Sequence, residues 1–565
     1  MKKILLTISF CAILTSNAQI PTLEWAKQIG GSSNELGLAM NVDLAGNVYT
    51  AGVFSGTMDF DPGPLTLIVT SIGSVDAFIT KSDPSGNLIW AKTFGGTLNF
   101  VYGITTDAVG NLYLTGSFQD TTDFDPGVNT FNLISAGSWD TYISKWDTDG
   151  NFLWAKRVGA GGTNDGGYDV VIDVNRNVHI AGTYNQTVDF DPGTGSSNLT
   201  AAGSTDSFIL KLDASGNFIW AKGVGGTSSE QVKSLVVDAA GNVYFTGDFF
   251  GTCDFDPGAG SFNLTSAGSA DAFICKLDVS GNFAWAMRAG ASSDDRAFSI
   301  ALDNAGNVLT TGHFDGVVDF DPASPVANLS SAANSSDAFI LKLDGSGNYI
   351  WAKKTGGNFN DGGRNITTDA NGNAYYSGYY TGSVDFDPDT NSFLLPGSSS
   401  GDLFISKLDA AGNFVWAVGF GGSTPQDFAE EIIVDAAGKV YCTGNFEGTA
   451  DLDPGPLTLN FTSAGVGDVY MIKLTQTPVG IAENLIENNF TVFPNPANNQ
   501  IAIYGLPFTE PCEIKIVDVM GKEIFKTKVT SEKTEIDVSK FEKGNYFVQL
   551  LTDHKTFTQK LIIQH

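Results

Sequence analysis

Residues 232–249 read VKSLVVDAAGNVYFTGDF, residues 251–270 read GTCDFDPGAGSFNLTSAGSA, and residues 271–290 read DAFICKLDVSGNFAWAMRAG. Four short runs in this stretch are rich in β-branched and aromatic residues, which favour strands. The pattern D-x-x-G-N joins the first run to the second and the third to the fourth, and in it Asp caps a turn while Gly accepts a positive φ. The stretch therefore predicts two tight hairpins, with strands a, b, c and d at Val232–Val237, Asn242–Phe249, Asp271–Leu277 and Asn282–Arg288.

The same unit recurs along most of the chain. Internal repetition at a fixed period is typical of solenoids and propellers. An acidic D-F-D-P-G motif or a close variant occurs once in each copy, as does an aspartate at the start of strand c. A Trp-Ala pair in strand d marks the seven copies, at intervals of 64 to 66 residues: Trp25, Trp90, Trp154, Trp220, Trp285, Trp351 and Trp416.

The two ends of the repeat array favour a closed ring over an open solenoid. The array begins with a single d strand around Trp25, continues through six complete sets, and stops after an a-b-c set that ends at Lys473 and Leu474. Pairing of the first strand with the last c strand would remove the exposed edges that a solenoid keeps. We therefore predict an all-β fold, in which residues 19–474 form a seven-bladed β-propeller with four strands per blade and a ring closed by the N-terminal strand.

These units resemble the secreted bacterial β-propeller repeats labelled SBBP, over about residues 21–474. That family name implies little about function. The run KLDASGNFIWAK, residues 211–222, also resembles the tryptophan-docking repeat of quinoprotein propellers and, more loosely, the Asp-box of sialidases. Because the motif is structural in those families, we expect each Trp to pack between blades.

Composition and the N-terminal residues limit the partners and the location of the protein. The 565 residues include 62 acidic and 31 basic ones, and a net charge of −31 repels nucleic acid. Lys2 and Lys3 precede the apolar run Ile4–Leu14, which predicts a signal peptide over residues 1–18 and is too short to span a bilayer. No other stretch is predicted to be transmembrane.

Cys253 and Cys275 fall at core positions of one repeat unit. Two alternatives are open for this pair: two free thiols, or a disulfide bridge within the unit.

The last part of the chain, residues 485–565, has a different composition and follows a linker at 475–484. It contains FPNPA at 493–497, a Met-Gly-Lys turn at 520–522 and the strand GNYFVQL at 544–550, and its alternating pattern predicts a small Ig-like β-sandwich. These marks resemble the type A C-terminal sorting domain of the type IX secretion system. The resemblance implies passage across the outer membrane, followed by removal of the tail and release or attachment at the cell surface. An ordinary adhesive Ig-like module is the alternative.

The DFDPG motif is the strongest candidate for chemistry. Its two aspartates flank a Phe, so in an extended chain both carboxylates point to one side, which suits Ca²⁺. Asp-Pro-Gly is equally a turn signal, in which Asp caps and Pro fixes φ. The predicted calcium ligands are Asp59, Asp61, Asp123, Asp125, Asp189, Asp191, Asp254, Asp256, Asp319, Asp321, Asp385, Asp387, Asp451 and Asp453.

The second set of candidate residues concerns a partner. The long b–c and d–a loops share one rim of the predicted ring, and loops on a rigid scaffold usually carry binding. One position near the end of strand b changes from copy to copy, while the next stays aromatic. We therefore predict exposed partner-binding residues at this rim, in strand b and the neighbouring d–a loops: Asp248, His313, Tyr379, Arg296 and Arg364.

No catalytic or cofactor-binding residue is predicted. The repeats hold two histidines on different blades, and neither a nucleophile elbow nor an H-E-x-x-H motif occurs. The sequence favours a secreted or cell-surface, non-catalytic binding or adhesion module for a glycan or protein partner, exported by the type IX machinery. The alternatives are a secreted glycan-active hydrolase or lyase that uses loop-face carboxylates, and a structural surface-layer component.

Overall fold

The computed structural model describes residues 20–321, 326–332, 335–389, 391–399, 401–422, 427–476, 490–504, 512–518, 521–529, 531, 533–551 and 556–564. The predicted signal peptide (1–18) and most of the predicted linker lie outside these residues. The chain divides into two compact units, residues 1–476 and residues 477–565. Among the described residues, none belongs to a helix long and apolar enough to cross a membrane.

The first unit consists of antiparallel strands, as the sequence predicts. Each copy of the repeat forms strands a, b, c and d, which pair in that order. The complete sets are β2(Leu36–Val42), β3(Val48–Phe54), β6(Asp76–Ser82), β7(Leu88–Phe94); β8(Leu98–Thr106), β9(Leu112–Gln119), β12(Asp140–Trp146), β13(Phe152–Val158); β14(Gly166–Ile172), β15(Val178–Tyr184), β18(Asp206–Leu212), β19(Phe218–Gly226); β20(Glu230–Val237), β21(Val243–Phe249), β24(Asp271–Leu277), β25(Phe283–Ala289); β26(Arg296–Leu302), β27(Val308–Asp315), β30(Ser336–Leu343), β31(Tyr349–Thr355); and β32(Gly362–Thr368), β33(Ala374–Tyr380), β36(Asp402–Leu408), β37(Phe414–Gly422).

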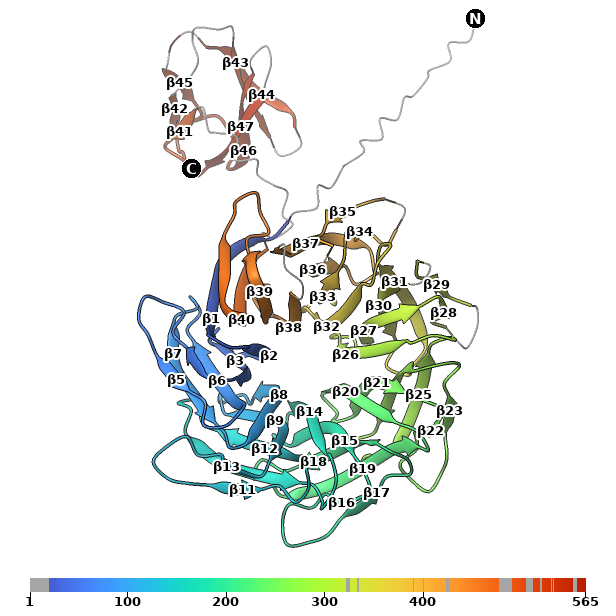
Figure 1. Cartoon of the computed structure of the whole chain (residues 1–565). Helices are drawn as coiled ribbons and strands as arrows, with labels where there is room; N and C mark the ends of the chain where they lie inside the picture. Colours follow the sequence, from blue (N-terminus) through green and yellow to red (C-terminus); the bar gives the residue numbers. More distant parts are fainter. Residues whose placement is uncertain are drawn as a thin grey trace, which may run out of the picture. The chain divides into compact units, whose positions relative to one another are not determined.

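The remaining set joins the two ends of the repeat array. β38(Phe428–Val434), β39(Val440–Asp451) and β40(Asn460–Thr475) supply its a, b and c strands, and β1(Thr22–Gly31) pairs antiparallel with β40. In this register Trp25 lies opposite Lys473 and Ile29 lies opposite Val469. Figure 1 shows the sheets arranged around a common centre, with the a strands innermost.

A short strand pair between strands b and c was not predicted. The DFDPG segment begins with three residues that pair with three residues further along, so each copy carries a small outer hairpin. In the last set the same pairing continues β39 and β40. The separate pairs are β4(Thr57–Asp59) and β5(Ile68–Thr70), β10(Thr121–Asp123) and β11(Asn132–Ile134), β16(Thr187–Asp189) and β17(Asn198–Thr200), β22(Thr252–Asp254) and β23(Asn263–Thr265), β28(Val317–Asp319) and β29(Asn328–Ser330), and β34(Ser383–Asp385) and β35(Leu394–Pro396).

The D-x-x-G-N hairpins follow directly from their residues. In one of them Asp213 Oδ1 accepts N–H bonds from Ser215 at 2.8 Å and Asn217 at 2.9 Å, while Oδ2 accepts one from the Asn217 side chain. The glycine, Gly216, has φ +77°. In one copy Arg176 takes the glycine position with φ +64°, so that turn departs from the pattern at Arg176.

Most of the repeated tryptophans donate their indole N–H to a carbonyl in the c–d turn of the next set, whereas Trp416 donates to the Gln476 side chain and the buried Trp154 indole N–H has no partner within the described residues. The Trp90 indole N–H donates to the Thr148 carbonyl at 3.4 Å, and Lys81 Nζ of the same set donates to it at 2.9 Å. Gly150 has φ +75°, and a Cβ there would lie only 3.1 Å from Lys92 and 3.2 Å from the Trp90 ring, so this turn favours glycine. Trp25 and Lys473 both reach the Pro84 carbonyl and thereby join the last set to the first. Indole contacts of the same kind run from Trp220 to Val279, Trp285 to Gly345 and Trp351 to Ala410.

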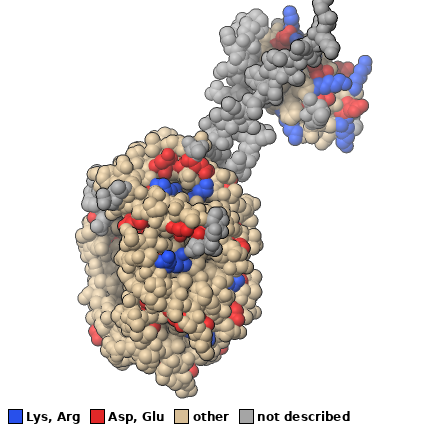
Figure 2. Space-filling view, turned by 90° about the vertical axis from the view of Figure 1, so that its right-hand side faces the viewer, with Lys and Arg blue, Asp and Glu red and all other residues tan. Residues whose placement is uncertain are grey.

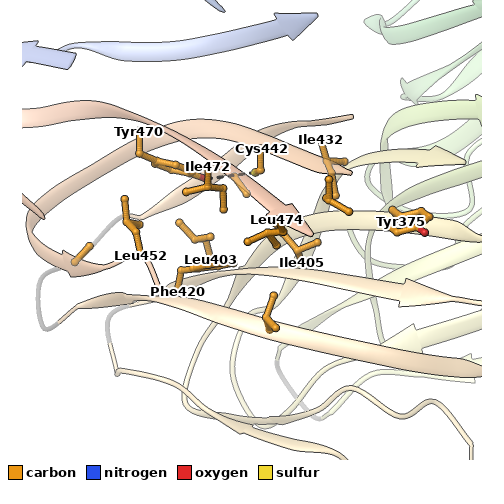
Figure 3. Packing of buried hydrophobic residues seen from close by; sticks show 14 of the residues in the cluster. Tyr375, Leu403, Ile405, Phe420, Ile432, Cys442, Leu452, Tyr470, Ile472 and Leu474 are labelled. Carbon is orange, nitrogen blue, oxygen red and sulfur yellow. Dashed lines mark hydrogen bonds between the residues drawn. The ribbon is translucent and has the colours of Figure 1, made fainter. Parts of the chain in front are cut away.

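Apolar side chains fill the space between neighbouring sheets. In one cluster Leu403, Ile405 and Phe420, from β36 and β37, pack against Ile432 and Leu474 of the last set. Figure 3 shows these side chains interleaved between the two sheets. Since each such cluster draws on two sets, neither set can bury its apolar face alone.

The second unit is a pair of sheets around one apolar core. β41(Thr491–Phe493), β42(Gln500–Tyr504) and β45(Lys533–Asp537) form one sheet, and β44(Glu523–Lys528), β43(Glu513–Asp518), β46(Gly544–Leu551) and β47(Thr556–Ile563) form the other. Ile501 and Ile536 of the first sheet share a core with Val548 and Leu561 of the second. Asn495 of the FPNPA motif donates to the Lys560 carbonyl and accepts from the Ile562 N–H, so the motif is held against the last strand.

Candidate functional site

The DFDPG segments are closed by their own backbone. Asp59 Oδ1 accepts N–H bonds from Asp61 at 3.1 Å and from Leu67 at 2.8 Å, and Asp61 Oδ1 accepts one from Gly63 at 2.7 Å. Phe60 between them is fully buried. The bond between the two aspartates recurs with Asp123, Asp189, Asp254, Asp319, Asp385 and Asp451 as acceptors.

These bonds are the ones that the turn hypothesis predicts. Within the part of the chain that the structure describes, no group of three or more His, Cys, Asp or Glu side chains is placed to hold a metal ion. Backbone carbonyls and water can also complete a calcium shell. Calcium binding at these loops therefore stays a prediction.

Buried carboxyl pairs connect neighbouring sets. The aspartate that begins strand c, such as Asp337, lies close to an acid just before strand a of the next set, here Asp361. Both are almost completely buried. Asp361 accepts N–H bonds from Gly357 and Thr381, whereas Asp337 Oδ1 has no hydrogen-bond partner. The other pairs are Asp140 with Asp165, Asp206 with Glu230, Asp271 with Asp295, Asp402 with Asp427, and Asp468 with Glu35.

Burial makes these acids hold their protons to a higher pH than exposed carboxyl groups do. It raises the pKa of Glu35, Glu230, Asp361 and Asp427 to about 7, and that of Asp165 and Asp295 to about 6. The neighbouring carboxylate adds to the effect, because two adjacent negative charges repel. Since the arrangement repeats between sets, we assign it to the scaffold.

The inner strands carry a β-bulge at the same place in every set. In β20, for example, the pairing with β21 skips Lys233 between Val232 and Ser234. A bulge leaves its extra residue unpaired and re-aims its side chain, and bulges often lie beside functional sites. The skipped residues are Leu38, Tyr102, Tyr168, Lys233, Phe298, Arg364 and Glu430.

These bulge residues line the central channel. All of them border one cavity of about 760 Å³ between the inner strands. Each is half-buried, so its side chain is surrounded by protein yet reachable from the channel. The bulge residues therefore give the channel aromatic and charged side chains, most of which differ from set to set. By contrast, Figure 2 shows an outer side of the molecule, where uncharged residues cover most of the first unit and charged ones gather in small groups.

Acidic residues also face the channel, beside the basic bulge residues. The residue after the bulge is Glu431 in β38 and Asp169 in β14. Burial raises the pKa of Glu430 and Glu431, and raises that of Asp169 to about 6. Asp169 accepts N–H bonds from Val170 and Leu235, so backbone donors occupy both of its oxygens.

A smaller aromatic pocket opens beside the channel. It has a volume of about 200 Å³ and is lined by Phe100, Tyr102, Trp139 and Tyr168, with Ser117, Asn164, Asp165 and Thr183 among its polar residues. The Phe100 and Tyr102 rings are stacked at 5.8 Å, and Trp139 and Tyr168 meet them edge-on or tilted at 5.6 Å. All four rings are half-buried. The pocket lies where strands a begin and strands b end, the rim at which the sequence places binding.

The predicted partner-binding residues lie close to this channel in two groups. Arg364 lies over the Tyr379 ring at 5.6 Å. Arg296 pairs with Asp248 at 3.4 Å and with Asp294, which is also 3.7 Å from His313. Two expectations are wrong. Asp248 is buried, because the strands and Arg296 cover it, and Arg296 and Arg364 lie on β26 and β32 rather than in loops.

Among the bulge residues, sequence reasoning named only Arg364 and missed the others, although a signal exists. Aligned copies show mostly unlike residues at this position of strand a, each directly after a Gly, Ala or Val. Of the two alternatives for the cysteine pair of the fourth copy, the structure has free thiols rather than a bridge. Cys253 and Cys275 are buried free thiols, and burial raises the pKa of both.

Comparison with known proteins identifies the tail. Residues 491–564 match the family described as "Secretion system C-terminal sorting domain". This confirms the predicted resemblance and identifies the segment as the sorting tail of type IX secretion. The resemblance of residues 21–474 to SBBP repeats stays a prediction.

The chain also resembles several proteins at low identity. An "Uncharacterized WD repeat-containing protein L264" of Acanthamoeba polyphaga mimivirus is 23% identical over 412 residues, which are 61% of this chain and 29% of that protein, so the chain spans less than a third of that relative. The extracellular domain of the putative one component system BT4673 from B. thetaiotaomicron is 11% identical over 94% of this chain and 68% of that one, with a TM-score of 0.27. PorZ of Porphyromonas gingivalis is 12% identical over 96% and 100%, with a TM-score of 0.17. Scores this low support no inference about function.

The buried carboxyl pairs predict an unusual pH dependence of stability. A carboxyl with a raised pKa holds its proton in the folded chain after the unfolded chain has lost it, so stability falls as pH rises from about 4.5 through about 7. We expect the urea midpoint of the folded protein to decrease across this window. The double variant Asp361→Asn/Asp427→Asn should flatten the slope, because Asn carries no titrating proton and already stands at this place in one set, as Asn99. Asp149→Asn, at an exposed turn acid, is the control. A midpoint that rises over the window would contradict this assignment.

Proposed function

We propose that residues 19–474 form a seven-bladed β-propeller that binds a glycan at the cell surface or outside the cell without catalysing a reaction. Seven Trp-marked copies support the blade count. The pairing of β1 with β40, together with the contacts of Trp25 and Lys473 on Pro84, supports a ring whose last blade is shared. The sorting tail supports delivery to the cell surface.

The aromatic pocket is the observation that favours a glycan. Aromatic faces pack against the C–H face of a sugar ring, and nearby hydroxyl, amide and carboxyl groups can bind its hydroxyls. The pocket combines Tyr102 and Trp139 with Ser117, Asn164 and Thr183. At about 200 Å³ it is smaller than a typical drug-sized pocket and suits one residue of a longer chain. A protein partner would more often use a broad, flat surface.

A glycan-active hydrolase is the second candidate. Glycoside hydrolysis commonly uses two carboxyl groups, one of them protonated near neutral pH. Glu430 and Glu431 face the channel, and burial raises the pKa of both. They lie on successive residues of one strand, so they do not face each other across a substrate, and we favour binding. A third role, as a structural surface-layer component, requires neither site.

The sorting tail predicts the fate of a truncated chain. Removal of residues 485–565 should leave the first unit folded but retained in the periplasm, because the tail carries the signal for outer-membrane passage. Immunoblots of periplasm, cell surface and medium measure this, and the full-length chain is the control. We also expect the mature secreted form to lack the tail. Efficient surface delivery of the truncated chain would refute the assignment.

The aromatic pocket predicts which substitutions abolish binding. On a glycan array, the labelled first unit should bind a defined set of oligosaccharides. Tyr102→Ala and Trp139→Ala should each weaken that binding roughly tenfold or more, because central aromatic contacts dominate small interfaces. Phe359→Ala, at an exposed aromatic outside the pocket, is the matched control.

Three results separate the candidates. Unchanged binding in both variants would exclude the pocket. Binding of no glycan would favour the structural role. Shortening of the bound glycan, lost in Glu430→Gln or Glu431→Gln, would favour the hydrolase.

A further inference from the structure

Two basic bulge residues, Lys233 and Arg364, face the channel. Along the chain, Lys233 is the bulge residue before Phe298, and Arg364 is the bulge residue after it. Lys233 Nζ donates to the Gln231 side chain at 2.6 Å and lies 5.6 Å from the Tyr168 ring. Within the described residues, neither Lys233 nor Arg364 forms an ion pair, although acids outnumber bases two to one in the chain.

Aromatic rings hold the Arg364 guanidinium in place. Its central carbon lies 5.0 Å from the Phe298 ring, 5.6 Å from Tyr379 and 5.6 Å from Phe428. Its Nε atom is buried and has no hydrogen-bond partner. Aromatic faces stabilise the charge of an arginine but do not satisfy its N–H groups, which point outward in the guanidinium plane. The buried Nε atom cannot reach the channel, but Arg364 lines the cavity and no hydrogen bond of its guanidinium is found within the described residues, so the terminal N–H groups can take a ligand there.

The ion pairs nearby involve Arg296 rather than Lys233 or Arg364. Arg296 pairs with Asp248 and Asp294. Asp248 also interacts electrostatically with Lys233, and burial lowers the pKa of Lys233. Glu430 lies next to Arg364 in the order of bulge residues, but the two form no ion pair within the described residues. Burial also favours the neutral form of Glu430.

The side of the channel with Lys233 and Arg364, called the basic side, is continuous with the aromatic pocket. Tyr168 and Tyr102 border both cavities, and Lys233 lies over the Tyr168 ring. A sugar packed on these rings can direct a substituent toward Lys233 and Arg364. A planar carboxylate matches the paired N–H donors of a guanidinium better than any neutral group does.

We propose that this site recognises an acidic sugar, whose carboxylate binds Arg364 and Lys233 while its ring packs on Tyr168 and Tyr102. The proposal rests on the proposed glycan-binding function and adds the class of sugar. It goes beyond that function, because a neutral glycan would satisfy the aromatic pocket alone.

The test compares one oligosaccharide with and without its charge. Isothermal titration of the purified chain with an oligogalacturonate and with its methyl ester keeps the sugar ring and removes the negative charge. We expect the acid form to bind about tenfold or more tightly, because hydrogen bonds between charged groups are roughly twice as strong as neutral ones. The preference should weaken with added salt.

Three variants locate the effect. Arg364→Gln should abolish the preference for the acid form and leave binding of the ester unchanged, whereas Arg364→Lys should keep part of it. Arg176→Gly is the matched control, because it removes an exposed arginine at a turn of positive φ that glycine tolerates. Melting curves verify that each variant folds.

Each outcome decides between two claims. Equal binding of the acid and the ester by the wild type would overturn the acidic-sugar proposal and leave glycan binding standing. An equal loss of both ligands in Arg364→Gln would also overturn it, because Arg364 would then support the pocket rather than read the charge. Tight binding of only a sulfated oligosaccharide would replace the carboxylate with another anion and contradict the proposal. Binding of neither uronate form nor any neutral glycan would overturn the proposed function as well.

Discussion

The docking of a tryptophan and a lysine on the turn of the next set is the contact on which the rest of the first unit depends. Trp90 and Lys81 reach the same carbonyl, that of Thr148, and Gly150 leaves room for the indole ring. This contact fixes the distance and angle between neighbouring sheets, so that apolar side chains such as Leu403 and Ile432 can fill the space between them. Because Trp25 and Lys473 make the same contact on Pro84, the constraint passes from the last set back to the first.

A scaffold held by repeated residues leaves other positions free to differ. The turn aspartates, the docking tryptophans and the buried carboxyl pairs recur, and they contact backbone or a neighbouring set. The bulge residues of the inner strands differ between most sets. They make no ladder hydrogen bonds, so a change from Leu38 to Tyr102 or Arg364 leaves the sheet intact. The fold thereby separates stability from recognition, and the aromatic pocket and the basic side of the channel both use the free positions.

Much of the fold was predictable, because the signals are local and repeated. The D-x-x-G-N turns define the hairpins, and the single strand around Trp25 indicates its pairing with the end of the array. The outer hairpin of the DFDPG segment was missed, because its three-residue strands are too short for a pattern. The bulges were missed for a different reason: strict alternation of side chains assumes an unbroken ladder, and one extra residue re-aims the chain. That extra residue places Arg364 on a strand facing the channel rather than in a loop, and strand packing buries Asp248.

The central claim is that repeated residues hold the scaffold and the bulge residues carry recognition, and a paired substitution scan measures this most directly. One group of variants changes turn aspartates to alanine (Asp83, Asp213, Asp344). The other group changes bulge residues to alanine (Tyr102, Lys233, Arg364). Melting temperature and glycan affinity are measured for every variant. For the turn variants, the account predicts lower melting temperatures and an unchanged glycan affinity of the folded fraction. For the bulge variants, it predicts weaker glycan binding and nearly unchanged melting temperatures. The account would be contradicted if the turn variants lost glycan binding at unchanged stability. It would also be contradicted if the bulge variants were strongly destabilised but kept their glycan affinity.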